Sequence, residues 1–531
     1  MILQNSAVDD IREARTSLGI ELGSTRIKAC LIGSEATEVL ATGSFSWQNR
    51  LIEGRWTYMI DEMWTGLQAA YAALIDDVHE RHGVRPETFG AIGVSAMMHG
   101  YLAFDESGEL LVPFRTWRNT STGAASAELG ALFGVNIPLR WSIAHLHQAV
   151  LDAEPHVGRI ASINTLAGYV HQELTGERVL GVADASGMFP IDLTTGDYDS
   201  WMLHVYDTLV GDRLPAPAAE LLPAVRQAGA AAGTLTADGA ALLDPSGALR
   251  PGIPLCPPEG DAGTGMVATN SVAPRTGNVS AGTSIFAMVV LERPLSDVHH
   301  ELDLVTTPAG DPVAMVHCNN GASELAAWVA LFTRFAAAAG LPVSDDTVFD
   351  VLFREALDGE SDAGGLVAYN HLAGEPIVGL IEGRPLFVRT PDSALTLANF
   401  MRAQVYGVFG TLALGMQVLA AEGVRIDRMF AHGGMFRTTG VAQRFLAGAL
   451  DAPVAVGELA GEGGAWGIAV LASYLGEAED FSLAEYLEQR VFATASLTVT
   501  DPDRVDVAGF VSYLDRYRAG LAVEAAAAAS L

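Results

Sequence analysis

Basic residues are scarce in this chain. Lysine and arginine together number 31, against 63 aspartates and glutamates, which gives a formal net charge of −32. Such an excess of negative charge repels nucleic acid and anionic membranes, so we expect neither as a partner. A polyanionic ligand such as ATP would need local cations and backbone N–H donors in order to bind.

Cysteine is also scarce, and the three cysteines are scattered. Cys30, Cys256 and Cys318 are odd in number and show no metal-ligand spacing. We therefore expect no disulfide framework and a reducing, cytoplasmic location.

Long uninterrupted apolar runs are absent. The most apolar segment, residues 400–421, is broken by Arg402, Gln404, Gln417 and glycines. It falls short of the roughly 18 continuous apolar residues that suggest a membrane span. We expect a buried helix there.

The start of the chain lacks the pattern of a secretory signal. Asp9, Asp10 and Glu13 stand where such a signal would have a basic start and an apolar core, so we expect a short leader.

At 531 residues, of which 50% are hydrophobic, the chain is too long for one core. Two well-packed domains, or three subdomains, are expected.

The first informative segment is residues 19–33, in which two apolar runs flank a Gly-Ser-Thr turn. This order predicts a β-hairpin whose tip suits a phosphate, because it offers a flexible glycine, hydroxyl and N–H donors, and a cation. Glu21 beside the tip would repel a phosphate unless it works through a hydrated Mg²⁺. On these residues alone, an ordinary hairpin with a polar turn is the commoner explanation. The tip residues are Gly23, Ser24, Thr25 and Lys28.

Residues 277–290 repeat this order: an apolar strand, a small hydroxyl-rich turn at 281–284, and a second apolar strand. The separation of roughly 260 residues exceeds the periods of repeat arrays, so it indicates duplication of a domain. Two halves with one phosphate-binding hairpin each imply a cleft between them.

Several other segments combine regular structure with polar or glycine-rich loops. A strand at 90–95 leads into Met97–Gly100, and a strand at 426–431 leads into a glycine pair, where backbone can approach a ligand. We also expect a helix at 323–338, a helix from 465 to 475 opened by residues 461–464, and a solvated helix around Tyr513 in 500–531.

In this order the segments resemble the FGGY carbohydrate kinases, sugar kinases of the actin-like ATPase fold, from about residue 17 to 518. The resemblance implies an α/β fold of duplicated actin-like ATPase (ribonuclease H-like) domains with an interdomain cleft. It divides the chain into an N-terminal sugar-binding domain at 17–255, a C-terminal catalytic and nucleotide-binding domain at 256–480, and a helical extension at 481–531. The matching segments are GIELGSTRIK, MMHG, EGDAGTG, SAGTS, NNGAS, HGGM and EGGAWGIAVLA.

The resemblance also implies roles on the phosphate side. Asp261 matches the catalytic aspartate that accepts the proton of the attacking sugar hydroxyl; alone it would read as a helix cap. Lys28 at the first hairpin matches a position that meets the phosphates of ATP. The residues implied in ATP binding are Gly23, Ser24, Thr25, Lys28, Gly282, Thr283, Gly321, Gly433 and Gly434. For the last two, a tight turn without a ligand is the alternative.

On the sugar side, Met98 and His99 resemble the Met-His-Gly of xylulokinases, where backbone and imidazole contact sugar hydroxyls. Trp117 and Asn119 match residues lining the sugar pocket, by stacking and by hydrogen bonding. Without the resemblance, His99 would be a local hydrogen-bond anchor and Trp117 a core residue.

Some positions depart from the family pattern. Glu21 replaces the usual aspartate, which keeps the charge for Mg²⁺, bound through water, but lengthens the side chain; Asn119 replaces an aspartate common in xylulokinases. Arg118 replaces a smaller residue, and Arg437 aligns only loosely with a polar residue expected after the glycine pair.

The leading hypothesis is an ATP- and Mg²⁺-dependent kinase acting on a ketopentose, most like D-xylulose. A gluconate, ribulose or polyol kinase is the alternative, since Ala96–His99 also resembles gluconokinases; an acidic sugar would demand a cation such as Arg115 or Arg118. An actin-like ATPase or sugar-responsive regulator is a third hypothesis. Relatives are often dimers, which leaves a homodimer open.

Overall fold

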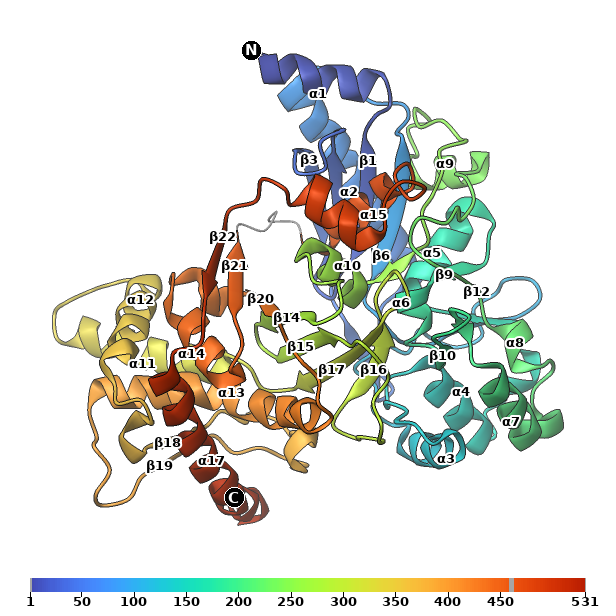
Figure 1. Cartoon of the computed structure of the whole chain (residues 1–531). Helices are drawn as coiled ribbons and strands as arrows, with labels where there is room; N and C mark the ends of the chain where they lie inside the picture. The colour runs from blue at the N-terminus through green and yellow to red at the C-terminus, as the bar shows by residue number, and fades with distance from the viewer. Residues whose placement is uncertain (1, 458–462, 531) are drawn as a thin grey trace. The chain divides into compact units, whose positions relative to one another are not determined.

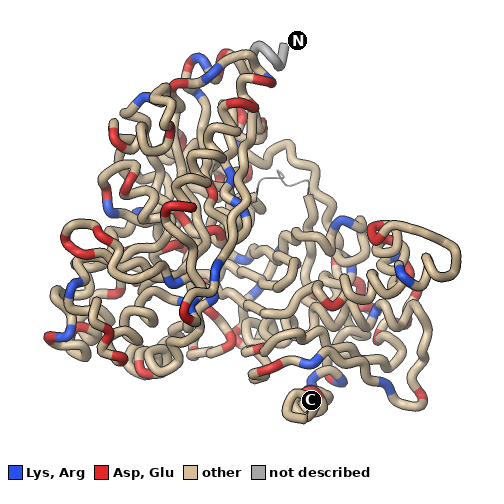
Figure 2. Tube along the Cα trace, turned by 180° about the vertical axis from the view of Figure 1, so that it is seen from behind, with Lys and Arg blue, Asp and Glu red and all other residues tan. Residues whose placement is uncertain are grey.

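The computed structural model describes residues 2–457 and 463–530, which fall into two compact units (Figure 1). Neither unit is one continuous segment of the chain. The first unit consists of Met1–Val272, Leu304–Val313 and Leu459–Thr494, and the second of Ala273–Asp303, Ala314–Glu458 and Ala495–Leu531. Figure 2 shows acidic residues spread over both units.

A five-stranded sheet in the order β13-β6-β1-β2-β3 forms the centre of the first unit. β1 pairs antiparallel with β2 and parallel with β6, and β13 adds to β6 in parallel. Because β13 extends this sheet, Asp261, directly after it, belongs to the first unit, although the sequence placed residues from 256 onward in a second domain. The strands are β1 (Ser17–Leu22), β2 (Arg26–Ile32), β3 (Val39–Ser46), β6 (Ala91–Ala96) and β13 (Glu259–Gly260).

Two helices pack against this sheet, and one of them comes from late in the chain. α2 (Ile60–His82) packs against β2 and β3, while α15 (Gly464–Tyr474), from late in the chain, packs against β1 and β6. The buried residues of α2, among them Met63, Leu67, Leu74 and Val78, recur at helical spacing. The α15 prediction is confirmed from Gly464 on, whereas residues 461 and 462 lie outside the described residues.

The expected leader instead forms a helix, α1 (Ile2–Arg12). The buried carboxylate of Asp10 accepts hydrogen bonds from the Ser34 N–H and hydroxyl at 2.8 and 2.7 Å. These bonds anchor α1 to the loop after β2.

Shorter elements complete the first unit. They are β4 (Arg50–Ile52), β5 (Arg55–Thr57), β7 (Leu102–Phe104), α3 (Gly123–Phe133), α4 (Ser142–Leu151), β8 (Ser162–Asn164), α5 (Leu166–Thr175), β9 (Val179–Gly181), α6 (Val182–Ala185), β10 (Ile191–Asp192), β11 (Asp197–Tyr198), α7 (Ser200–Val210), α8 (Ala218–Leu221), β12 (Ala224–Arg226), α9 (Ala237–Leu243), α10 (Asp261–Ala268) and α16 (Leu483–Tyr486).

The second unit is built on a sheet that contains the strand order β17-β15-β14-β20-β21-β22. β14 pairs antiparallel with β15 and parallel with β20, and β20 pairs parallel with β21. The order β21-β20-β14-β15 thus repeats β13-β6-β1-β2 in sequence and direction, which confirms the predicted duplication. These strands are β14 (Thr276–Ala281), β15 (Ile285–Val290), β17 (Pro312–Cys318), β20 (Arg428–His432), β21 (Val454–Gly457) and β22 (Leu497–Thr500). The strand β16 (Asp303–Thr306) lies almost entirely in the segment Leu304–Val313 of the first unit.

The central helix of the second unit is α13 (Leu397–Ala421). It is long and apolar enough to cross a membrane by length and composition, yet 78% of its most apolar window is buried inside the protein, as predicted. The other elements are α11 (Ser323–Ala338), α12 (Asp345–Glu355), β18 (Val367–Tyr369), β19 (Leu386–Val388), α14 (Val441–Leu450) and α17 (Arg504–Ser530).

The C-terminal segment differs from the expected helical extension. β22 pairs antiparallel with β21, so this segment also contributes an edge strand to the sheet. Tyr513 and Tyr517 of α17 are fully buried, so the prediction of a solvated helix at these residues is wrong. Their aromatic rings pack against Tyr406 and Tyr369.

Candidate functional site

The first predicted hairpin is present as β1 and β2. The Gly23 N–H donates to the Arg26 carbonyl at 2.9 Å and closes the turn. The Gly23 carbonyl accepts from the indole of Trp47, and the Ser24 carbonyl from the hydroxyl of Tyr58, each at 2.7 Å. Since these bonds occupy carbonyl oxygens that would repel an anion, the tip is suited to a phosphate.

The side chains at this tip divide into an exposed and an enclosed group. Ser24 and Thr25 are exposed, whereas Glu21 and Lys28 face each other across the hairpin, with Lys28 Nζ 3.4 Å from Glu21 Oε2. This pair neutralises one anionic side chain beside the proposed phosphate position.

Glu21 is held in a tight environment. Burial raises the pKa of its carboxyl and the Asp261 charge raises it further, while the Lys28 cation acts in the opposite direction. Position 464 must be small, because a Cβ there would lie 2.5 Å from Glu21 Oε1. The longer glutamate therefore fits because glycine begins α15.

The residues around Glu21 fit a hydrated Mg²⁺. Its Oε2 atom is buried, and the Lys28 ammonium 3.4 Å away is the charged group beside it. Among residues 2–457 and 463–530, no three His, Cys, Asp or Glu side chains are arranged to hold a metal directly. Mg²⁺ is typically bound by one or two carboxylates together with water and substrate phosphates.

Asp261 is the first residue of α10, at the point where β13 ends. Its Oδ1 accepts a hydrogen bond from the Met98 N–H at 3.0 Å. The carboxylate reaches solvent, yet the enclosing protein raises its pKa; backbone donors at Met98 and Ala262 and the Arg140 charge lower it in part. A positioned carboxylate with an open side can accept a proton from a bound hydroxyl.

Two buried carboxyls that the sequence reasoning missed lie behind Asp261. Glu259 accepts the Asp184 N–H at 2.9 Å, and Asp184 accepts the Thr165 hydroxyl at 2.6 Å. Burial raises the pKa of Asp184 to about 7; the Thr165 bond lowers it and the Asp261 charge raises it. Burial and the Asp184 charge likewise raise the pKa of Glu259. They are therefore expected to hold protons more readily than ordinary carboxyls.

Met98 and His99 follow β6 and are both buried. His99 has a left-handed backbone with φ 70°, and its Nδ1 lies 3.4 Å from the Gly187 carbonyl oxygen. The Gly100 N–H donates to the Arg140 carbonyl at 3.3 Å. Asp261, Met98 and His99 thus lie in one cluster, together with Arg140, which carried no signal in the sequence.

Trp117 and Asn119 differ in exposure. Trp117 is 37% exposed, so its reading as a simple core residue is wrong. Asn119 is buried, and its amide bonds the Trp56 N–H, the Trp56 carbonyl and the Thr116 carbonyl. Contact of either residue with a sugar stays a prediction. The Asn119 amide has little hydrogen-bonding capacity left for a sugar, because it already bonds Trp56 and Thr116.

Three arginines are candidate cations for this site. Arg115 is buried in an ion pair with Glu154, and Arg118 stacks over the Trp56 ring with 3.8 Å to its centroid. Arg140 is half-buried, and its charge acts on Asp261. Arg140 is therefore a third candidate, beside the two predicted arginines, for the cation that an acidic sugar would need.

In the second unit, the predicted nucleotide-side residues lie together at one end of the sheet. The Gly321 N–H donates to the Thr283 carbonyl at 2.7 Å, and a Cβ at Gly321 would lie 2.4 Å from the Gly282 oxygen. Gly433 has φ 110°, and a Cβ there would lie 2.2 Å from the Ala281 oxygen. Gly434 begins the next turn in open space. Gly321 and Gly433 are thus required by close backbone approach, whether or not a ligand binds, whereas the space around Gly434 does not require glycine.

Arg437 is already engaged. It pairs with Asp346 at 2.9 Å and lies over the Phe349 ring. Its loose alignment with a polar family residue therefore gains no support from these contacts.

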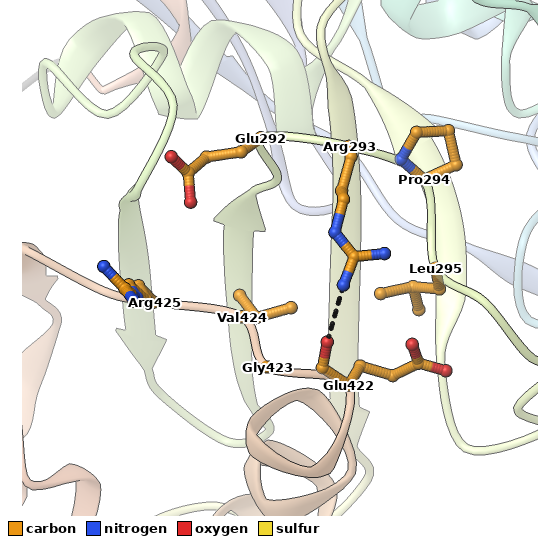
Figure 3. A pocket seen from close by; sticks show the side chains of 8 residues that line it. All are labelled: Glu292, Arg293, Pro294, Leu295, Glu422, Gly423, Val424 and Arg425. Carbon is orange, nitrogen blue, oxygen red and sulfur yellow. Dashed lines mark hydrogen bonds between the residues drawn. The ribbon is translucent and has the colours of Figure 1, made fainter.

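A separate cavity of about 230 Å³ in the second unit contains none of the predicted residues (Figure 3). The Glu422 carboxylate beside it accepts the Ser296 and Asp297 N–H groups, and Arg293 donates to the Glu422 carbonyl. Arg293 and Glu422 thus join two loops. The lining residues are Glu292, Arg293, Pro294, Leu295, Glu422, Gly423, Val424 and Arg425.

Comparison with known proteins finds two domain models of one family in this chain. The FGGY family of carbohydrate kinases, N-terminal domain, matches residues 16–267, and its C-terminal domain matches residues 277–475. A xylulose kinase of Escherichia coli (strain K12) is 24% identical over 206 residues, which is 38% of this chain and 41% of that protein. The match thus spans less than half of that relative.

Solved structures share the fold over nearly the whole chain. A xylulose kinase from Rhodospirillum rubrum gives a TM-score of 0.78 at 22% identity, covering 96% of this chain and 99% of the other. A gluconate kinase from Lactobacillus acidophilus gives 0.77 at 16% identity, covering 96% and 98%. At such identities the likeness establishes the fold and leaves the sugar open.

Proposed function

Since the chain belongs to the FGGY family of carbohydrate kinases, and is therefore a sugar kinase that uses ATP, we propose that its acceptor is the terminal hydroxyl of a ketopentose, most like D-xylulose. The observation that carries this proposal is the contact between Asp261 and the backbone of Met98. It joins the proposed base to the Met-His-Gly segment that resembles xylulokinases.

In this proposal Asp261 Oδ accepts the proton of the sugar hydroxyl as that oxygen bonds to the γ-phosphorus. The bond from the γ-phosphorus to the bridging oxygen breaks, and ADP leaves with that electron pair. Positioning and electrostatic stabilisation supply most of the rate enhancement, and the base contributes about 10²–10⁴-fold.

The other predicted residues bind and orient. Lys28 and the donors of the first hairpin tip would bind phosphate oxygens, and Glu21 would hold Mg²⁺ through water. When bound, Mg²⁺ neutralises phosphate charge. In the second unit, the glycine cluster at Gly321, Gly433 and Gly434 would accommodate the nucleotide, because it exposes backbone without side chains. Cytoplasmic location and a homodimer stay predictions.

Asp261→Ala should abolish sugar phosphorylation while ADP binding stays near normal. ADP release should be measured over a panel of pentuloses, polyols and gluconate, with Asp152→Ala, an exposed acidic position, as the matched control. Near-normal turnover in Asp261→Ala would show that another group is the base. Turnover without any sugar would instead indicate an ATPase.

Gluconate or a similar sugar acid is the second candidate, and Arg140 favours it. Its charge acts on Asp261, so a cation lies near the group that would activate the acceptor. If the substrate is a sugar acid, Arg140→Ala should raise its KM at least tenfold, the loss of a charge-assisted hydrogen bond worth about 1.5–3 kcal/mol. An equal effect on neutral sugars would contradict a carboxylate contact.

A further inference from the structure

A buried acid–imidazole pair fastens the end of α17 to the rest of the second unit. Both carboxylate oxygens of Glu524 lie 2.7 Å from His371 Nδ1, and both side chains are fully buried. The other imidazole nitrogen lies 3.0 Å from the Thr411 hydroxyl and 3.1 Å from that of Tyr517. Both ring nitrogens of His371 are therefore bonded and its orientation is fixed.

Such a pair is unexpected in an alanine-rich helix end. A buried carboxylate is costly unless it is paired and hydrogen-bonded, and an apolar residue would anchor the helix as well. Besides His371, the Arg384 N–H approaches Glu524 at 3.5 Å. The polar pair thus imposes a particular geometry on the segment that carries His371.

That segment touches the proposed nucleotide loop directly. Asn370 precedes His371, and its amide nitrogen donates to the carbonyls of Asn320 at 3.2 Å and Gly321 at 2.8 Å. The Gly321 N–H continues to the Thr283 carbonyl at 2.7 Å in the turn of the second hairpin. Hydrogen bonds and one peptide link therefore connect Glu524 to Thr283.

The residues after His371 hold the same loop from a second direction. Asn320 Oδ1 accepts the N–H groups of Leu372 and Ala373 at 2.8 and 2.9 Å. Glu375 accepts the Asn320 N–H at 3.2 Å and its amide nitrogen at 3.0 Å. Residues 370–375 thus form a cradle for Asn320 and Gly321.

We propose that α17 is a positioning element for nucleotide binding, with Glu524 and His371 holding the 370–375 cradle against the Asn319–Gly321 loop. This inference rests on the proposed function, which assigns that loop to the nucleotide. Glu524 and His371 are positioning residues, since they act through Asn370 and Asn320 and do not touch the ligand.

ADP in the presence of Mg²⁺ is the direct probe. Calorimetric titration of Glu524→Ala should show ADP affinity reduced about tenfold, within the range of energetic couplings through packed networks, with the KM for the sugar changed less than twofold. Glu524→Gln should recover most of the affinity, because its amide oxygen can still accept the His371 N–H. Val523→Ala, at a 52% exposed position on the same helix, should bind ADP like the wild type.

Asn370→Ala tests the connection from the other side and keeps the proposal falsifiable if Glu524→Ala does not fold. It should also weaken ADP, and the double variant should lose less than the sum of the single losses, because the two residues act in one network. Hydrogen exchange at 319–322 should accelerate in both.

Two outcomes separate the hypotheses. If the wild type binds ADP and both Glu524→Ala and Asn370→Ala bind it equally well, this inference is overturned and the proposed function stands. If the wild type binds no ADP, the proposed function is overturned, and this inference with it.

Discussion

Replacing Gly464 with alanine should raise the Mg²⁺ concentration that turnover requires, while the protein still folds. The added Cβ would lie 2.5 Å from Glu21 Oε1 and 3.1 Å from the Thr264 hydroxyl oxygen. Because the Glu21 carboxyl is the end of a flexible side chain, it is expected to move while the backbone stays. That movement carries the proposed metal carboxylate away from its position beside Lys28.

Two opposing contributions set the stability of Gly464→Ala. Alanine in place of glycine stabilises a helix by about 0.5–1 kcal/mol, whereas overpacking costs about 1–3 kcal/mol. We expect a net loss of about 1 kcal/mol. Loss of groups that orient a metal ligand typically costs about 10–100-fold in metal affinity or activity, so the Mg²⁺ concentration for half-maximal turnover should rise at least tenfold.

The assay is sugar-dependent ADP release as a function of Mg²⁺ concentration, alongside thermal unfolding. Gly123→Ala is the matched control, since Gly123 also begins an 11-residue helix and a Cβ there would meet nothing within 4 Å. The double variant Glu21→Asp, Gly464→Ala should recover Mg²⁺ dependence, because aspartate is one methylene shorter. Wild-type Mg²⁺ dependence in Gly464→Ala, or no recovery in the double variant, would refute this reasoning.

Two further substitutions test groups next to the site. Burial raises the pKa of Asp184 from 3.8 to about 7. The contribution of Asp184 to stability is therefore complete below pH about 4 and is lost as the pH rises to about 7. Between pH 5 and pH 8, urea unfolding should show that the free energy of unfolding falls less in Asp184→Asn than in the wild type, by up to about 3 kcal/mol. The same pH dependence in both proteins would contradict this environment. Asn119→Ala should lower the free energy of unfolding by about 1–3 kcal/mol, because buried backbone groups of Trp56 lose their hydrogen-bond partners. The KM for the sugar should be nearly unchanged. A large rise in KM at unchanged stability would instead indicate that the Asn119 amide contacts the substrate.

Local patterns predicted much of the fold. The two hairpins were readable because an apolar strand, a small polar turn and a second apolar strand are determined by neighbouring residues. The helix at Ser323–Ala338 and the buried helix at Leu397–Ala421 follow from apolar spacing in the same way. The resemblance then supplied the arrangement that local pattern could not.

The unit division could not be predicted, because it depends on pairings between distant residues. β13 is only two residues long, and nothing in its sequence shows that it pairs with β6. The helix α15 joins the sheet of β1, although more than 400 residues separate them (Figure 1). The edge strand β22 was missed for the same reason.

The candidate site could also be predicted only in part, because several of its contacts join residues that are distant in the sequence. Residue types at loops pointed to Asp261, Met98 and Glu21, but the effect of the Arg140 charge on Asp261 arises only in the folded chain. The hydrogen bonds between Asn119 and the Trp56 backbone could not be predicted either, because the sequence does not distinguish an amide that bonds backbone from one that bonds a sugar. The burial of Tyr517 depends on a partner surface far away in sequence.

The ion pair between Lys28 and Glu21 gives the protein an unusual chemical property. Every cationic side chain other than Lys28 is an arginine, since the sequence contains no other lysine. An amine-directed reagent therefore finds one side-chain target, at the tip of the hairpin that packs under α15. A fluorophore or an isotope label can report on this hairpin in the unmutated protein, once the α-amino group has been distinguished by its lower pKa.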